Sequence, residues 1–170
     1  MRITTVLGDI TRQQVDAIGN AANSRMRGGG GVDGAIHRAG GPAVLEDCIR
    51  RFPDGLPTGR AGWTTAGDLP ARWVIHLVGP NWTAGQRDPE LLASCYREAL
   101  AVADELGVDT LALPAVSAGI YGWPVDDAAR IAARSVHTSG SAVEEVRFVL
   151  FSSDVHQIFE ASVTQVVSDL

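Results

Sequence analysis

The sequence predicts an α/β domain in which helices cover both faces of a mostly parallel sheet. Two observations predict this class. Short apolar, β-branched runs alternate with helical patterns along the 170 residues, and no repeat, linker or charge run divides the chain. The length suits one hydrophobic core and is short for two. Residues 1–170 are therefore expected to form a single domain.

Six segments are rich in apolar or β-branched residues and are bounded by turn-forming residues, as buried strands are. Because the runs are short and nearly continuous rather than alternating, both faces of the sheet should be covered. The expected strands are residues 3–7, 16–20, 62–66, 73–78, 110–113 and 146–151.

The clearest helical pattern covers residues 89–106, where apolar side chains recur every three or four positions. Asp88 suits the N-cap, Pro89 the first helical position and Gly107 the residue after the last turn. Three further helices are expected, one from about residue 32, one from residue 124 and one over residues 155–167.

The acidic balance limits the classes of partner. With a formal net charge of −6, the chain is not expected to bind extended nucleic acid, which depends on basic side chains. All fourteen basic residues are arginine, which excludes a Schiff-base lysine and a Walker-type phosphate loop. No apolar run reaches the ~18–20 residues of a membrane helix, and the first residues lack a signal-peptide core. We therefore expect a cytoplasmic protein without membrane contact.

The two cysteines do not indicate a metal or disulfide framework. Cys48 and Cys95 are far apart in sequence, and neither has a neighbour at metal-ligand spacing. Both are expected to be small buried side chains. No metal and no cofactor are expected.

Two glycine-rich loops each follow a predicted strand and precede a predicted helix. In the first, Gly28, Gly29, Gly30 and Gly31 remove every side chain, so backbone N–H groups can approach an anion beside a helix N-terminus. The second, residues 114–122, repeats this arrangement. Either loop alone more often only permits a tight turn. Because both follow strands of one parallel sheet, they can converge on a diphosphate.

Four stretches of this sequence carry a family resemblance in family order, and with Pro57-Thr58-Gly59 they span residues 3–151. On these stretches the chain resembles the macrodomain family, specifically its MacroD-like class. They are Gly8-Asp9-Ile10-Thr11, residues 20–37 from Asn20-Ala21-Ala22-Asn23 through the four glycines to His37, Ile75-His76-Leu77-Val78-Gly79-Pro80, and Ser117-Ala118-Gly119-Ile120-Tyr121-Gly122.

The resemblance implies a three-layer α/β/α fold, with a mixed, mostly parallel six-stranded sheet and a cleft for ADP-ribose. Asp9 would accept a hydrogen bond from the adenine amino group, with Ile10 and Phe151 beside the base. Asp9 could equally be a turn residue that ends a strand. The remaining substrate-binding set, which would hold the diphosphate and distal ribose, is Asn20, Gly30, Gly31, Val32, Ser117, Ala118, Gly119, Ile120, Tyr121 and Gly122.

By the same resemblance, Asn23 and Asp33 would lie beside the distal ribose and are the expected catalytic residues. Asn23 can orient a ribose hydroxyl, and Asp33 can accept a proton from water. Asn23 could instead close an Asx-turn, and Asp33 could only complement a helix N-terminus. His37 and His76 are expected to pack rather than to act in catalysis.

The implied function is a metal-independent hydrolase that removes ADP-ribose from glutamate or aspartate side chains of mono-ADP-ribosylated proteins. O-acetyl-ADP-ribose is a further expected substrate, and the protein is expected to be a monomer. Two alternatives stay open: a reader that only binds ADP-ribose, and a phosphatase acting on ADP-ribose 1″-phosphate.

Three positions depart from the family pattern. Gly19 replaces a β-branched residue and is expected to loosen its strand, Leu56 replaces a cysteine, and Trp123 replaces a smaller aromatic. Trp63, Trp82 and Trp123 are expected to shape the rim of the cleft.

Overall fold

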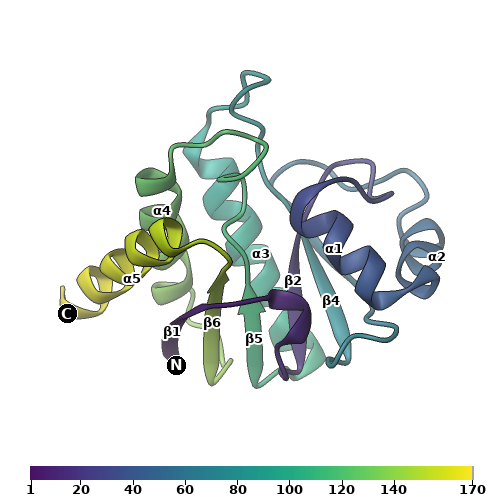
Figure 1. Ribbon diagram of the computed structural model, residues 1–170, viewed down its shortest axis with the longest axis horizontal. Helices are drawn as coiled ribbons and strands as arrows, with labels where there is room; N and C mark the ends of the chain where they lie inside the picture. Colours follow the sequence, from purple (N-terminus) through teal and green to yellow (C-terminus); the bar gives the residue numbers. More distant parts are fainter. Residues whose placement is uncertain (170) are drawn as a thin grey trace.

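The computed structural model describes residues 1–169 and has the predicted class, an α/β/α sandwich (Figure 1). Its strands are β1 (Arg2–Leu7), β2 (Ala17–Ala22), β3 (Ala61–Thr65), β4 (Trp73–Val78), β5 (Thr110–Leu113) and β6 (Glu145–Leu150). Its helices are α1 (Gly31–Gly40), α2 (Pro42–Arg51), α3 (Pro89–Leu106), α4 (Val125–His137), α5 (Ser153–Ser168) and the 3₁₀ turn η1 (Ile10–Arg12).

The strands form one sheet in the order β1-β6-β5-β2-β4-β3. All neighbouring pairs are parallel except β3 and β4, which are antiparallel, so the sheet is mixed as expected. The parallel strands end at one edge, where loops follow β2, β5 and β6 (Figure 1). This edge is where ligands of open α/β sheets bind.

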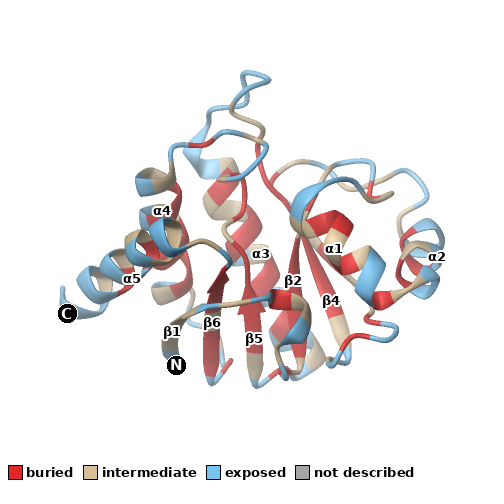
Figure 2. Ribbon diagram, in the orientation of Figure 1, coloured by how far each residue is buried: buried red, intermediate tan, exposed pale blue. Residues whose placement is uncertain are grey.

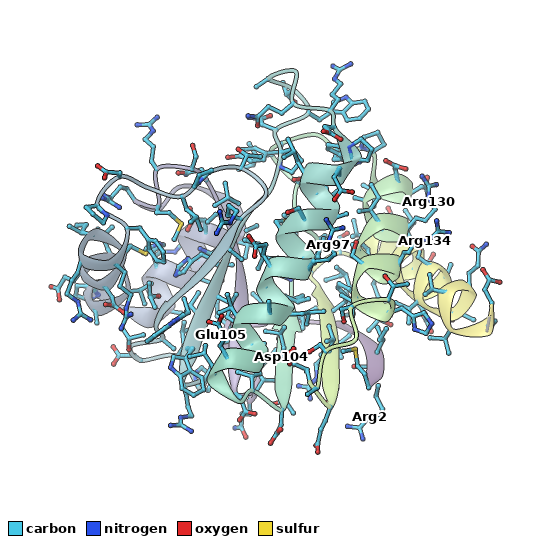
Figure 3. The ribbon with its side chains drawn as sticks, turned by 180° about the vertical axis from the view of Figure 1, so that it is seen from behind. Arg2, Arg97, Asp104, Glu105, Arg130 and Arg134 are labelled. Carbon is cyan, nitrogen blue, oxygen red and sulfur yellow. The ribbon has the colours of Figure 1, made fainter. Side chains whose placement is uncertain are left out.

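Helices cover both faces of the sheet and bury an apolar cluster on each. One face packs against α3, α4 and α5, whose buried side chains include Tyr96 and Phe159. The other face packs against α1 and η1 through Ile36 and Ile10, with α2 beside α1. Figure 2 shows the buried strands and the exposed outer sides of the helices. Seen from behind, α3 and α4 present arginines and acidic residues side by side to solvent (Figure 3).

Helix α3 confirms its sequence signals. Asp88 accepts a hydrogen bond from the N–H of Glu90, Pro89 begins the helix, and Gly107 follows it in the left-handed conformation with φ 70°. Cys95 lies on its buried face, as predicted. None of the helices in residues 1–169 is both long and apolar enough to span a membrane.

Several predicted boundaries need correction. β2 extends beyond residue 20 to Ala22, because its parallel pairing with β4 continues to Val78. β6 ends at Leu150, so Phe151 lies just outside it. Helix α5 begins at Ser153, because the Ser152 hydroxyl accepts a hydrogen bond from the N–H of Val155. Helix α2 and the turn η1 were not predicted.

Gly19 tightens the sheet rather than loosening it. A Cβ atom at Gly19 would lie 2.6 Å from Cδ2 of Leu113 and 3.1 Å from the carbonyl oxygen of Ala112. The expectation of a loosened strand is therefore wrong, because Leu113 fills the space that a β-branched side chain would need.

Candidate functional site

A cleft of about 320 Å³ opens at the carboxyl ends of the parallel strands, where the two glycine-rich loops face each other. Both expected catalytic residues line it, as do most of the predicted binding residues. Those are Asn23, Gly30, Gly31, Val32, Asp33, Ser117, Ala118, Gly119, Ile120, Tyr121 and Phe151. Asp9, Ile10, Asn20 and Gly122 do not line the cleft.

The first loop brings Asn23 and Asp33 to either side of one glycine. A Cβ atom at Gly29 would lie 3.3 Å from both Asn23 Nδ2 and Asp33 Oδ2, a tight contact that glycine avoids. The side chain of Asn23 also closes a turn, since Nδ2 donates to the carbonyl oxygen of Gly28 and Oδ1 accepts from the N–H of Arg25. The Asx-turn and a role at the cleft therefore coexist in Asn23.

Asp33 lies in the first turn of α1 and is buried, with two partners on one carboxylate oxygen. Asn20 Nδ2 donates to Asp33 Oδ1 over 2.8 Å, and His37 Nε2 lies 3.3 Å from the same oxygen. Oδ2 lies instead beside Gly29. Oδ1 is thus held by two side chains, and Oδ2 lies at the first glycine-rich loop.

Behind Asp33, a hydrogen-bonded chain fixes the state of His76. Burial lowers the pKa of His76 to about 4, so its imidazole is neutral at pH 7. Asn20 must present Nδ2 to Asp33, and the same amide group lies 3.1 Å from His76 Nδ1, which therefore accepts. The proton on His76 is then at Nε2, which lies 2.8 Å from Thr64 Oγ1. Thr64 donates in turn to the carbonyl oxygen of Thr65.

Sequence reasoning missed this chain. His37 stands four residues after Asp33, a spacing that places both on one helix face and could have indicated their contact. No sequence signal pairs Asn20 with His76, because they become neighbours only through the register of β2 and β4. Cys48 Sγ lies 3.8 Å from His76 Nε2, and burial raises the pKa of this thiol to about 11. Cys48 is thus the inert buried residue that was expected.

The first turn of α1 and the second loop supply backbone donors. The N–H groups that begin a helix have no intrahelical acceptor, and those of Gly31 and Val32 begin α1 at the cleft. In the second loop, Ser117 adopts φ 66°, unusual for a non-glycine residue, and its carbonyl oxygen accepts from the N–H of Trp123. This closes the loop so that residues 118–121 border the cleft.

Two side chains of the second loop face the first. Ile120 is 75% exposed, yet its Cδ1 lies only 3.4 Å from where a Cβ atom on Gly30 would be. Tyr121 is half-buried, and its pKa is raised by burial and by the nearby charge of Asp33. The phenol of Tyr121 therefore stays protonated and can donate a hydrogen bond on the Asp33 side of the cleft.

The predicted adenine side is only partly assembled. Phe151 is 83% exposed at the cleft, which leaves its ring free to stack. Ile10 is buried in the core and does not reach the cleft. Asp9 caps η1: its Oδ1 accepts from Thr11 N and Oγ1, and these hydrogen bonds lower its pKa. Its contact with adenine stays a prediction.

None of Trp63, Trp82 and Trp123 lines the cleft, so the structure does not confirm that they shape its rim. Trp123 is 2% exposed, and its Nε1 donates to Asp127, so it belongs to the core rather than to the rim. Trp63 lines a different groove. Trp82 is half-buried in the loop before α3, and its ring meets that of Trp123 edge-on at 4.9 Å.

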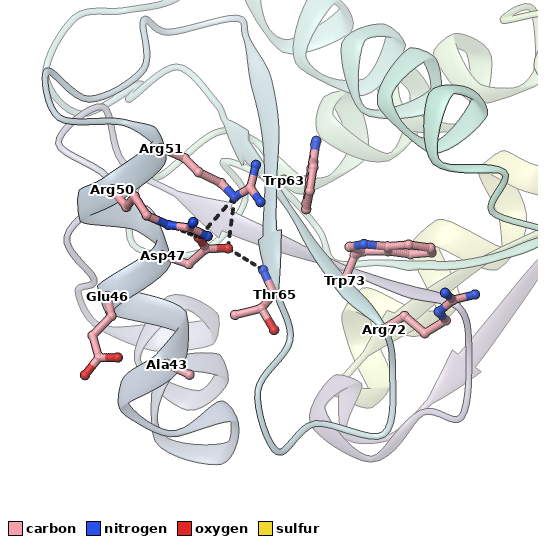
Figure 4. A pocket seen from close by; sticks show the side chains of 9 residues that line it. All are labelled: Ala43, Glu46, Asp47, Arg50, Arg51, Trp63, Thr65, Arg72 and Trp73. Carbon is pink, nitrogen blue, oxygen red and sulfur yellow. Dashed lines mark hydrogen bonds and ion pairs between the residues drawn. The ribbon is translucent and has the colours of Figure 1, made fainter.

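The groove with Trp63 has a volume of about 470 Å³, and Asp47 in its lining is bound by neighbouring residues (Figure 4). Asp47 accepts hydrogen bonds from Arg50, Arg51 and the N–H of Thr65, and the Arg51 guanidinium stacks 3.7 Å from the Trp63 ring centroid. Burial alone would raise the pKa of Asp47, but these hydrogen bonds outweigh it and the pKa is lowered. These contacts join α2 to the edge strand β3.

Within residues 1–169, no three histidine, cysteine, aspartate or glutamate side chains gather as metal ligands would. The arrangement at the cleft offers instead a cradle of backbone donors with an amide, a carboxylate and a phenol at one end. Such a site can hold an anion and position water or a sugar hydroxyl.

Comparison with known proteins agrees with this geometry. A family model described as "Macro domain" matches residues 19–132. A macro domain-containing protein of Streptomyces coelicolor is 61% identical over 163 residues, covering 94% of this chain and 96% of the relative. A protein of Escherichia fergusonii named O-acetyl-ADP-ribose deacetylase is 45% identical over 170 residues, covering 96% of each chain. A single-residue mutant of the Oceanobacillus iheyensis macrodomain, solved with ADPR, superposes with a TM-score of 0.90 at 38% identity, covering 96% of this chain and 92% of the other.

Proposed function

This chain belongs to the macrodomain family, and on that premise we propose that it hydrolyses the ester between ADP-ribose and glutamate or aspartate side chains of modified proteins. The observation that carries the proposal is the buried Asp33 in the cleft lining, with Oδ1 held by Asn20 and His37 and Oδ2 beside Gly29. Mere recognition of a diphosphate would not need a carboxylate at this place.

Ligand binding would use the backbone donors. The diphosphate would lie between the first turn of α1 and residues 119–121, where backbone N–H groups can bind an anion without lysine. Phe151 would stack on the adenine, which directs the distal ribose toward Asn23, Asp33 and Tyr121.

In the proposed reaction, a water oxygen bonds to ribose C1″ as the C1″–O bond to the protein carboxylate breaks. Asp33 Oδ2 accepts the proton of that water, and the electron pair of the broken bond leaves with the side-chain carboxylate. Asn23 and Tyr121 orient the ribose hydroxyls. Asn20 and His37 keep Asp33 in place, so positioning supplies most of the catalysis. No step in this scheme needs a metal.

O-acetyl-ADP-ribose is a second proposed substrate, because it carries an ester on the same ribose and the E. fergusonii relative is named its deacetylase. The proposed partners are mono-ADP-ribosylated proteins, met by a monomer in the cytoplasm. A reader would bind ADP-ribose without releasing it, and a phosphatase would release phosphate from ADP-ribose 1″-phosphate.

The test is to incubate the protein with a target mono-ADP-ribosylated on glutamate and to quantify free ADP-ribose. An arginine-linked target is the matched control, because its N-glycosidic bond has no carboxylate leaving group. The proposal expects release from the glutamate-linked target alone. Tight binding of ADP-ribose without release from either target would make the protein a reader.

A further inference from the structure

The loop that joins β4 to α3, residues 79–88, lies against the second glycine-rich loop; we name it the clamp loop. The carbonyl oxygen of Tyr121 accepts two hydrogen bonds from Thr83, one from its N–H at 3.1 Å and one from its Oγ1 at 3.3 Å. The next residue, Gly122, has φ 75°, and a Cβ atom there would lie 2.6 Å from Thr83 Oγ1. The two loops therefore touch without room for another side chain.

The clamp loop is braced internally. Asn81 and Gln86 close it, since the N–H of Gln86 donates to the carbonyl oxygen of Asn81 and the N–H of Asn81 donates to Gln86 Oε1. Arg87 stacks 4.5 Å from the ring centroid of Trp82, and its Nε donates to the carbonyl oxygen of the same residue. These contacts make the loop a fixed support for Thr83 rather than a free flap.

A second contact ties the clamp loop to the core beneath the glycine-rich loop. The ring of Trp82 meets the buried ring of Trp123 edge-on, an arrangement that stabilises aromatic pairs. The backbone N–H of Trp123 in turn donates to the carbonyl oxygen of Ser117 over 2.9 Å, which closes the second loop. The clamp loop thus contacts the Trp123 end of residues 117–123, and the hydrogen bond between Trp123 and Ser117 joins that end to the other.

The held segment forms one wall of the cleft. Tyr121 borders the Asp33 side, and Ile120 reaches the glycines of the first loop. A shift of the Tyr121 carbonyl would therefore change both the place of the phenol and the width of the cleft. Displacements near 1 Å can cost about 100-fold in rate when they misplace a reacting group.

We propose that Thr83 is a positioning residue, which fixes Tyr121 opposite Asp33 by holding its carbonyl oxygen from the clamp loop. The effect of Thr83 on turnover rests on the proposed hydrolysis, whereas its effect on the order of residues 117–123 does not. Thr83 itself is exposed and outside the cleft lining, so it acts through Tyr121 and not on the ligand.

The test is Thr83→Val, which keeps the shape of the side chain and the backbone N–H but removes the hydroxyl donor. We expect kcat to fall about five- to tenfold while the Kd for ADP-ribose changes less than about twofold, because the lost contact orients the ribose rather than the diphosphate. Hydrogen exchange in residues 117–123 should become faster. Thr83→Ser, which keeps the hydroxyl donor, should have the kcat and the exchange rate of the parent.

The matched control is Thr138→Val. The Thr138 hydroxyl also donates to a backbone carbonyl, that of Arg134, but at the opposite end of α4 from the second loop. We expect this variant to keep the parent kcat and the parent exchange in residues 117–123. The proposal would be overturned if kcat fell equally in Thr83→Val and Thr138→Val, or if Thr83→Val kept the kcat of the parent.

The readouts separate this inference from the proposed function. If the parent protein releases no ADP-ribose, the proposed hydrolysis is refuted. The positioning role of Thr83 is then tested by hydrogen exchange in residues 117–123 alone. Faster exchange in Thr83→Val than in Thr138→Val would support the clamp in that case. Unchanged exchange would overturn it.

Discussion

Asn20 Nδ2, buried behind the cleft, donates a 2.8 Å hydrogen bond to Oδ1 of Asp33, a buried residue of the cleft lining. The same amide group reaches His76, so one asparagine holds the carboxylate and the neutral imidazole in register. Because Oδ1 of Asp33 already has two partners, we assign proton acceptance to Oδ2, which lies beside Gly29 of the cleft lining. The candidate base is therefore oriented by residues that the ligand does not touch.

Asn20→Leu should lower both stability and turnover. The change keeps roughly the side-chain volume but leaves Asp33 and His76 without their shared donor, which should cost about 1–3 kcal/mol of unfolding free energy. We expect kcat to fall at least tenfold, with a small change in ADP-ribose affinity. Urea unfolding, calorimetric titration and a release assay measure the three quantities. Parent-like turnover would show that Asp33 does not need this partner.

His76 should make stability depend on pH. Its pKa is about 4 in the folded state and about 6.5 when unfolded, so the unfolded chain binds more protons between these values. The contribution of His76 to the free energy of unfolding should therefore be complete above pH 6.5. As the pH falls from 6.5 toward 4, the free energy of unfolding should decrease by up to about 3 kcal/mol. Urea unfolding of the parent and of His76→Gln across this range tests it. An equally steep pH dependence in the variant would contradict the assignment.

Gly19→Ala should destabilise the sheet by about 1–3 kcal/mol, because the new methyl group would meet Leu113 at 2.6 Å. Replacing Leu113 with Ala in the same chain opens that space. A double-mutant cycle by thermal or urea unfolding should therefore show a favourable coupling between the two changes. Additive losses would mean that the close approach to Leu113 is not the source of the strain.

Phe151→Ala should weaken ADP-ribose binding about three- to tenfold without loss of stability, because the ring is exposed and available for stacking on adenine. Ile49 is a suitable control, since it is also an exposed apolar residue but lies on α2. Ile49→Ala should keep the parent Kd in calorimetric titration. If Phe151→Ala also keeps it, the adenine does not lie against this ring.

The sequence predicted the strands and the two loops, because strand periodicity and turn residues are local signals. The placement of Asn23 and Asp33 at one site came from the family resemblance. It did not predict α2, whose short pattern of mixed charge begins directly after α1 at Pro42. The chain through Asn20, His76 and Thr64 was also missed, because it depends on the pairing of β4 with β2 and β3. Trp123 was misplaced at the rim because its contact with Trp82 joins two loops 41 positions apart.

The central claim is that Asp33 acts in catalysis rather than in binding, and Asp33→Asn tests it most directly. The amide keeps the shape of the side chain but cannot accept a proton as a carboxylate does. With a glutamate-linked target, we expect release of ADP-ribose to fall at least about 100-fold, while calorimetric titration gives a Kd for ADP-ribose within about threefold of the parent. Release at the parent rate by Asp33→Asn would contradict the account.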